Sequence, residues 1–298
     1  MTRQLTGVFG PVVTTFDSRG DVDLDAFGMN ARAHLDAGLH GLVVCGSTGE
    51  AALLEESERL RLIEMSRTVI PSDRWLIAGT GAESTRACVR RCKEAASRGA
   101  DAVLVVAPHY YSNAMTTKAL VAHYETVAVE SPIPVLLYNI PKYMHFRLEP
   151  ELVATLARHP NIIGMKDSSG DMATMARYLE AQGNDFTVIT GHAGTFHQAL
   201  QLGARGGILA VALFAADLAL EIYRAHRDGR PADAGEAQRR LAPMGAEIVG
   251  RLGIGAVKVA MERVGLSGGP VRLPLLEASP DEIAQVDALL RDAALVPA

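Results

Sequence analysis

The chain alternates short apolar runs with helical patterns eight times within its first 228 residues. A short apolar run is typical of a strand that is buried on both faces, as in a parallel sheet. A helical pattern follows each run, and it supplies the crossover that joins one parallel strand to the next. The predicted strands are residues 8–13, 41–45, 75–78, 102–106, 134–138, 162–165, 186–190 and 207–211, and the predicted helices are residues 23–37, 55–69, 84–97, 117–129, 150–158, 172–181, 194–202 and 216–227.

The connections between these segments are short and carry turn signals. Gly38, Gly99 and Gly203 each follow a predicted helix, where glycine adopts the left-handed conformation at no steric cost. Ser84 precedes another helix and can cap it. Eight strand–helix units predict an α/β fold, a closed (β/α)8 or TIM barrel. An open doubly wound sheet is the alternative, but it usually carries a GxGxxG turn after its first strand, and none is present here.

The last part of the chain has a different pattern. It contains no strand signal, and residues 233–249, 254–264 and 280–290 are predicted helices, the last two joined by the turn-rich residues 265–274. We therefore expect a catalytic barrel domain over residues 1–228 and a C-terminal extension of three helices over residues 229–298.

Composition limits the classes of partner. The 298 residues are 48% hydrophobic and 21% charged, which is ordinary for a globular protein, and the net charge of −5 gives no basic surface for nucleic acid. No run approaches the roughly 18 apolar residues that a membrane span requires. Three cysteines form neither a disulfide framework nor a CxxC pair. We expect a cytoplasmic protein without nucleic-acid or membrane partners.

One charged residue ends an apolar run. Residues 162–165 are apolar, and Lys166 follows them directly. Burial disfavours a charged ammonium, so this lysine either reaches the rim of the sheet or is a tuned amine. A tuned amine is what Schiff-base formation with a carbonyl requires. This residue alone leaves both interpretations open.

Other polar residues are predicted at the same end of the barrel, where the strands end and active sites of such barrels lie. Each has a structural explanation when taken singly: a tight turn, a packed aromatic ring, a helix cap or a structural histidine. Together they predict an amine, a phenol that moves protons, and hydroxyls that relay protons or hold a carboxylate. The residues at this end of the barrel are Ser47, Thr48, Tyr110, Tyr111, Tyr138, Lys166, Ser168, Gly191, His192 and Ile208.

Three motifs in this order carry a family resemblance: Gly46-Ser47-Thr48-Gly49-Glu50, Tyr138-Asn139-Ile140-Pro141 and Gly164-Met165-Lys166-Asp167-Ser168. They resemble the dihydrodipicolinate synthase/N-acetylneuraminate lyase family over nearly the whole chain. The resemblance implies a class I, lysine-dependent aldolase or lyase that acts on pyruvate or another small 2-oxo acid. It also implies a (β/α)8 barrel, no cofactor or metal, and a homotetramer built as a dimer of dimers.

The resemblance also implies a role for each matching residue. Lys166 forms the imine, and Tyr138 shuttles protons at the same carbon and at the substrate hydroxyl. Ser47 and Thr48 bind the carboxylate of pyruvate, and Thr48 can link Tyr138 to a second tyrosine from a neighbouring subunit. That second tyrosine is Tyr110 by its position after Pro108, with Tyr111 as the competitor. The groups that line the substrate pocket include Ser168 and the backbone of Gly191 and Ile208.

The substrate beyond the pyruvyl half is less constrained. Dihydrodipicolinate synthases carry an arginine where this chain has Tyr143, and N-acetylneuraminate lyases carry an acidic pair where it has His192-Ala193. Residues 159–168, 191–194 and 268–274 look closer to 4-hydroxy-2-oxoglutarate aldolases, which form pyruvate and glyoxylate. We therefore expect cleavage of 4-hydroxy-2-oxoglutarate. The alternatives are a 2-keto-3-deoxy-sugar-acid aldolase or dehydratase, and dihydrodipicolinate synthase itself, also called 4-hydroxy-tetrahydrodipicolinate synthase.

Residues 143–145 do not match the 4-hydroxy-2-oxoglutarate aldolase pattern well. A second carboxylate on the substrate would need a cationic or hydroxyl partner near the mouth of the barrel. The candidates are Lys142, His145, Arg147 and His192.

Two hypotheses from other classes stay open. A metal-dependent enzyme is compatible with nine histidines, although no HxH or HExxH spacing supports it. A non-catalytic protein that senses a 2-oxo acid could keep the same barrel, but it would be free to lose the lysine, tyrosine or hydroxyl residues that this chain retains.

Overall fold

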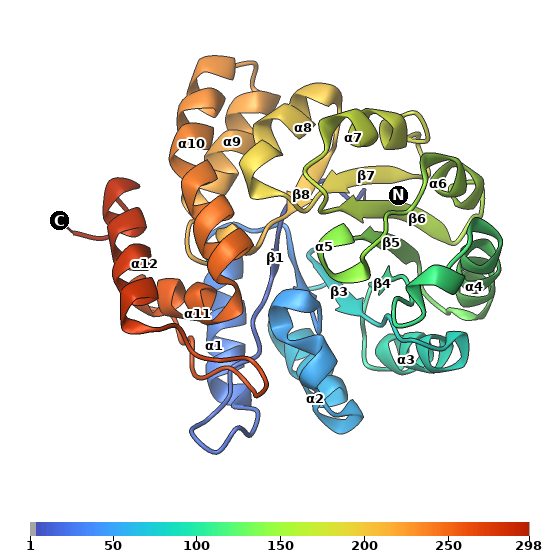
Figure 1. Ribbon diagram of the computed structural model, residues 1–298, viewed down its shortest axis with the longest axis horizontal. Helices are drawn as coiled ribbons and strands as arrows, with labels where there is room; N and C mark the ends of the chain where they lie inside the picture. Colours follow the sequence, from blue (N-terminus) through green and yellow to red (C-terminus); the bar gives the residue numbers. More distant parts are fainter. Residues whose placement is uncertain (1–3, 298) are drawn as a thin grey trace.

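Eight parallel strands form a closed barrel in the order of the sequence, with β1 paired to β8 (Figure 1). The computed structural model describes residues 4–297. Nearly every strand residue is buried, because the side chains fill the barrel on one face and pack under the helices on the other. The predicted (β/α)8 fold is confirmed. The strands are β1 (Gly7–Pro11), β2 (Gly41–Val44), β3 (Trp75–Gly79), β4 (Ala102–Val106), β5 (Val135–Asn139), β6 (Ile162–Asp167), β7 (Thr187–Thr190) and β8 (Gly206–Ile208).

Helices surround the barrel, and local sequence signals fix their ends. The Ser84 hydroxyl accepts a hydrogen bond from the backbone N–H of Ala87, as expected of a cap. Gly38, Gly99 and Gly203 have φ angles of 102°, 87° and 114°, so they take the predicted left-handed conformation. The outer helices are α1 (Leu24–Asp36), α2 (Glu56–Val69), α3 (Thr85–Ser97), α4 (Thr117–Glu130), α6 (Pro150–Leu156), α7 (Met172–Leu179), α8 (Phe196–Leu202) and α9 (Ala216–Arg227).

The predicted strand over residues 207–211 is partly wrong. Strand β8 ends at Ile208, and residues Ala210–Leu213 form a buried 3-10 helix in which the N–H of Ala212 bonds to the carbonyl of Leu209. A short apolar run can be a buried strand or a buried helical turn, and periodicity does not separate the two. In contrast, β6 is longer than predicted and includes Lys166 itself.

Short helices occur in the connections where no helix was predicted. Helix α5 (Pro141–Met144) follows β5, and 3-10 helices span Ser47–Gly49 and Ala51–Leu53 after β2. They matter because they lie at the end of the barrel where the candidate residues gather.

The C-terminal extension contains α10 (Pro231–Met244), α11 (Ile254–Arg263) and α12 (Pro280–Asp292). The single helix predicted over residues 233–249 instead widens after Met244 into a π-helix, η6 (Gly245–Leu252). Pro243 precedes this change, and proline lacks the N–H that the regular ladder uses. No helix within residues 4–297 is long and apolar enough to cross a membrane.

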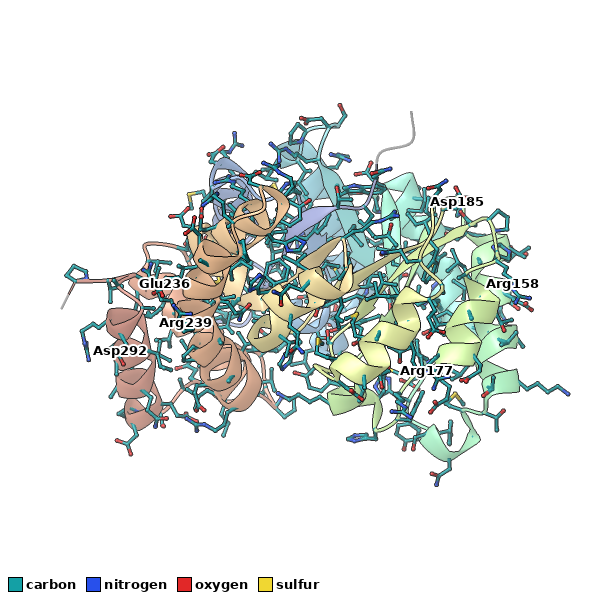
Figure 2. All side chains as sticks on the ribbon, turned by 90° about the horizontal axis from the view of Figure 1, so that it is seen from above. Arg158, Arg177, Asp185, Glu236, Arg239 and Asp292 are labelled. Atoms are coloured by element: carbon teal, nitrogen blue, oxygen red, sulfur yellow. The ribbon has the colours of Figure 1, made fainter. Side chains whose placement is uncertain are left out.

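The extension lies to one side of the barrel. Figure 1 shows α10 beside α9, and α12 packs against both α10 and α11. The same side carries the labelled Glu236 and Arg239 of α10 and Asp292 of α12 in Figure 2, away from Arg177 of α7. Helix α10 packs against both α8 and α9, so the extension contacts helices of the barrel directly. The division into two domains at residue 228 stays a prediction.

Candidate active site

Strand register places Lys166 next to Tyr138. The two residues are opposite each other on β6 and β5, and the Lys166 Nζ lies 3.2 Å from the Tyr138 hydroxyl and 4.3 Å from its ring centroid. Both side chains are buried, with 6% and 4% of their surface exposed. Within the described residues 4–297, no carboxylate pairs with this amine. The structure thus presents an enclosed lysine whose hydrogen-bond partner is a phenol.

The next residues on the same two strands hold this arrangement from behind. Successive strand residues face opposite sides of a sheet, so Asn139 and Asp167 point away from Lys166. The Asn139 Nδ2 donates to the Asp167 Oδ1 at 2.7 Å, and the Ser169 hydroxyl donates to the Asp167 Oδ2 at 2.8 Å. Burial raises the pKa of the Asp167 carboxyl, which these hydrogen bonds oppose. The network fixes the two strand ends relative to each other.

Eight of the ten residues predicted at this end of the barrel line one cavity of about 370 Å³ at the C-terminal ends of the strands. A lysine, a phenol and three hydroxyls therefore converge on this cavity, although no hydrogen bond joins Thr48 to Tyr138 in the part of the chain that the structure describes. The eight are Ser47, Thr48, Tyr138, Lys166, Ser168, Gly191, His192 and Ile208.

Gly191 is where the cavity wall comes closest to the lysine. A Cβ atom on Gly191 would lie 2.0 Å from the Ser168 Oγ and 2.5 Å from the Lys166 Cε. Contacts this short are sterically impossible, so residue 191 must be glycine for both side chains to keep their positions. The backbone N–H of Gly191 donates to the carbonyl of Asp167 at 2.6 Å, which brings β7 against the lysine-bearing strand.

The predicted second tyrosine does not lie in this cavity. Tyr110 is 76% exposed and Tyr111 is 69% exposed, and their rings pack edge to face at a centroid distance of 5.0 Å. Tyr111 lines a neighbouring cavity of about 1020 Å³, which also touches Ser47 and Tyr138. Within this single chain neither tyrosine completes the lysine site, so their role stays a prediction.

The four residues considered as partners for a second substrate carboxylate differ in which cavity they line. Lys142 and His192 line the lysine cavity, whereas His145 lines the neighbouring cavity and Arg147 lines neither. Burial lowers the pKa of the His192 imidazole, whose Nδ1 lies 3.0 Å from the Thr195 Oγ1. Tyr143, which stands at the position of the family arginine, also lines the lysine cavity.

A buried ionic cluster supports the turn that carries Ser47 and Thr48, and sequence reasoning missed it. Glu50 ends this turn in the left-handed conformation, with φ of 54°, and its carboxylate is 2.7 Å from the Lys258 Nζ of α11. The backbone N–H of Arg272 donates to the other Glu50 oxygen at 2.8 Å, and the Arg272 guanidinium pairs with Glu58. The sequence feature that could have indicated this cluster is Lys258, a charged residue on the apolar face of a predicted helix, between Val257 and Met261.

The possible metal ligands do not gather. Within residues 4–297 no group of three or more His, Cys, Asp or Glu side chains is arranged to hold a metal ion. Cys45, Cys88 and Cys92 are buried thiols without disulfides.

Comparison with known proteins agrees with this geometry. The sequence model described as the Dihydrodipicolinate synthetase family matches residues 4–293. A 4-hydroxy-tetrahydrodipicolinate synthase of Methanoculleus marisnigri is 35% identical over 287 residues, which cover 95% of this chain and 98% of the relative. The predicted resemblance to this class I aldolase family is confirmed.

Solved structures give the same result. The chloride-inhibited dihydrodipicolinate synthase of Acinetobacter baumannii, complexed with pyruvate, has a TM-score of 0.93 and 29% identity, covering 98% of this chain and 100% of that one. A monomeric dihydrodipicolinate synthase variant has a TM-score of 0.93 and 27% identity, covering 98% of each chain. This chain is therefore an enzyme that belongs to the dihydrodipicolinate synthetase family.

Proposed function

We propose that this enzyme forms a Schiff base between Lys166 and pyruvate or a small 2-oxo acid, and makes or breaks the adjacent carbon–carbon bond. The observation that carries the proposal is the 3.2 Å contact between the Lys166 amine and the Tyr138 hydroxyl inside the 370 Å³ cavity. The hydroxyls of Ser47 and Thr48 line the same cavity and are available to bind the 2-oxo acid's carboxylate.

The chemistry follows from this placement. The neutral amine attacks the 2-oxo carbon, and the carbinolamine loses water to give a protonated imine. The Tyr138 hydroxyl gives a proton to the departing water and then takes one from the carbon next to the imine, which leaves an enamine. The enamine carbon attacks an aldehyde, the new bond forms, and the aldehyde oxygen takes a proton from the Tyr138 hydroxyl. Water then releases the product and regenerates Lys166, and cleavage runs through the same steps in reverse.

The relatives favour one acceptor over the others. They are named 4-hydroxy-tetrahydrodipicolinate synthases, which supports that alternative more than the 4-hydroxy-2-oxoglutarate cleavage expected from sequence. Removing the carbons of pyruvate from 4-hydroxy-tetrahydrodipicolinate leaves a four-carbon amino-acid aldehyde, aspartate semialdehyde. We therefore propose condensation of pyruvate with aspartate semialdehyde. Cleavage of 4-hydroxy-2-oxoglutarate is the second candidate, because Tyr143 replaces the arginine of typical synthases and lines the cavity.

We also propose that the enzyme assembles as a homotetramer in which Tyr110 or Tyr111 reaches a neighbouring subunit. The exposure of both rings supports this, since large aromatic side chains exposed together mark interaction surfaces. Light scattering on the purified chain gives the oligomeric state, and a monomer at assay concentrations would contradict the proposal.

The central experiment is reduction with borohydride in the presence of pyruvate, followed by mass spectrometry of the intact chain and its peptides. We expect a pyruvyl adduct on Lys166. Lys166→Ala should prevent both the adduct and turnover while the circular dichroism spectrum is unchanged, because only the imine is lost. An adduct-free wild-type enzyme, or near-full activity of Lys166→Ala, would refute the mechanism.

The acceptor is identified in the same preparation. Aspartate semialdehyde with pyruvate, and 4-hydroxy-2-oxoglutarate alone, are compared by their values of kcat/KM. A tenfold or greater preference assigns the reaction. Activity that is lost on treatment with a chelator and restored by a divalent cation would instead favour the metal-dependent hypothesis.

A further inference from the structure

We propose that Lys142 binds a second carboxylate on the part of the substrate remote from its 2-oxo group, so that the enzyme selects 2-oxo dicarboxylic acids or acceptors that carry a carboxylate. This inference rests on the proposed function, because it takes the 2-oxo carbon to be held at Lys166. Lys142 is the second residue of α5, directly after Pro141, and it lines the same cavity as Lys166.

The charges around the cavity are unbalanced. Its lining includes Lys142 and Lys166 but no aspartate or glutamate. Two other basic side chains already form ion pairs: Lys258 is 2.7 Å from Glu50, and Arg147 is 3.3 Å from Glu149. Within the part of the chain that the structure describes, Lys142 has no such carboxylate partner. The net positive lining favours a substrate that brings its own negative charges.

The Lys142 ammonium is held in place, yet it keeps donors to spare. Its Nζ donates to the carbonyl of Gly250 in the π-helix η6 at 2.7 Å and lies 5.6 Å from the Tyr143 ring centroid. These contacts tie the loop after β5 to the C-terminal extension at the cavity. An ammonium has three N–H donors, so two remain for a carboxylate after the bond to Gly250.

The competing candidate is His192. It lines the cavity, but burial lowers the pKa of its imidazole, so at neutral pH it offers a hydrogen bond rather than a charge. It can orient a substrate hydroxyl or oxygen, whereas only Lys142 supplies a second full charge. This difference assigns the carboxylate to Lys142.

The experiment uses two substrate analogues that differ only in the distal group. Wild-type enzyme is reduced with borohydride over a range of 2-oxoglutarate or 2-oxopentanoate concentrations, and the adduct at Lys166 is quantified by mass spectrometry. We expect half-saturation at a roughly ten- to a hundredfold lower concentration of 2-oxoglutarate, as a hydrogen-bonded charge pair provides. Pyruvate, which has no distal group, serves as the reference in every variant.

Three variants separate the charge from other effects. Lys142→Met should abolish the preference for 2-oxoglutarate over 2-oxopentanoate, while a pyruvyl adduct still forms at Lys166 and shows that the variant is folded. Lys142→Arg should restore most of the preference because it restores the charge. Lys118→Met is the matched control, since Lys118 is an exposed lysine in the first turn of α4 that lines neither cavity.

The outcomes distinguish the two proposals. Equal trapping of the two analogues by wild-type enzyme, or an unchanged preference in Lys142→Met, overturns the role of Lys142 while a pyruvyl adduct leaves the Schiff-base function intact. Absence of every adduct in wild-type enzyme overturns both.

Discussion

Replacing Lys258 by methionine tests whether the buried ionic cluster holds the substrate-binding turn. The Lys258 and Glu50 side chains are 2% and 0% exposed, and their charged atoms are 2.7 Å apart. The Lys258 Nζ also donates to the carbonyl of Pro270 at 2.6 Å. Methionine has a similar length and keeps the apolar packing, so the variant removes mainly the positive charge.

The cost follows from the carboxylate that remains. Removal of one partner from a buried ion pair typically costs about 3–5 kcal/mol, because the other charge stays buried without compensation. Here Glu50 keeps the N–H of Arg272 as a donor, at 2.8 Å, which places the expected loss near the lower end, at roughly 3 kcal/mol. In a chain of this size that corresponds to a decrease in Tm of about 6 °C.

Urea unfolding and thermal melts of four proteins measure the effect. The set is wild type, Lys258→Met, Glu50→Gln and the double variant. The double variant should lose less than the sum of the single variants, since neither charge is then left alone. Lys93→Met is the matched control: its ion pair with Glu130 is also short, at 2.6 Å, but both side chains are about half exposed, so its loss should be below about 1 kcal/mol.

The same variants connect stability to function. Glu50 belongs to the turn that carries Ser47 and Thr48. Lys258→Met should therefore raise the pyruvate concentration required for half-maximal trapping, whereas the maximal yield of the adduct at Lys166 should change little. A loss of stability in Lys258→Met no larger than in Lys93→Met, or losses in the single variants that simply add, would refute the role given to the buried ion pair.

Three further predictions use the same protein. Tyr138→Phe should reduce kcat by roughly 10²–10⁴-fold, measured by steady-state turnover, while the adduct at Lys166 still forms, because the phenol and not the amine is removed. Gly191→Ala should abolish trapping of pyruvate without preventing folding, since its Cβ would lie 2.5 Å from the Lys166 Cε; a normal adduct yield would contradict the geometry. Burial lowers the pKa of His34 and of His123 from 6.5 to about 4, so the unfolded chain binds more protons than the folded chain between these pH values. The free energy of unfolding should therefore decrease as the pH falls from 6.5 to 4, by roughly 3 kcal/mol for each histidine. Urea midpoints measured across this pH range should decrease with falling pH in wild type and change less in a His34→Gln/His123→Gln variant.

Local patterns were sufficient for the barrel and for most of the lysine cavity. Eight apolar runs, the glycines after the helices and the rule that strand ends form the active site together placed Ser47, Tyr138 and Lys166 at one mouth. Patterns failed where buried segments of different types have the same composition, as in residues 210–211, which belong to a 3-10 helix and not to the predicted strand. The helical period also did not reveal that the helix after residue 231 widens into η6, although Pro243 marks the place where the regular ladder loses a donor.

The sequence by itself determined which residue types stand at the strand ends, because hydrophobic period and motif spacing are local properties. Only the tertiary structure decided which of them touch. Val135 lies opposite Ile162, but Leu136 lies opposite Gly164, so a one-residue irregularity in β6 brings Tyr138 opposite Lys166. Without it Tyr138 would face Met165, and the lysine would point to the other side of the sheet. Likewise, Glu50 and Lys258 are 208 positions apart in the numbering, and only the packing of α11 against the barrel pairs their charges.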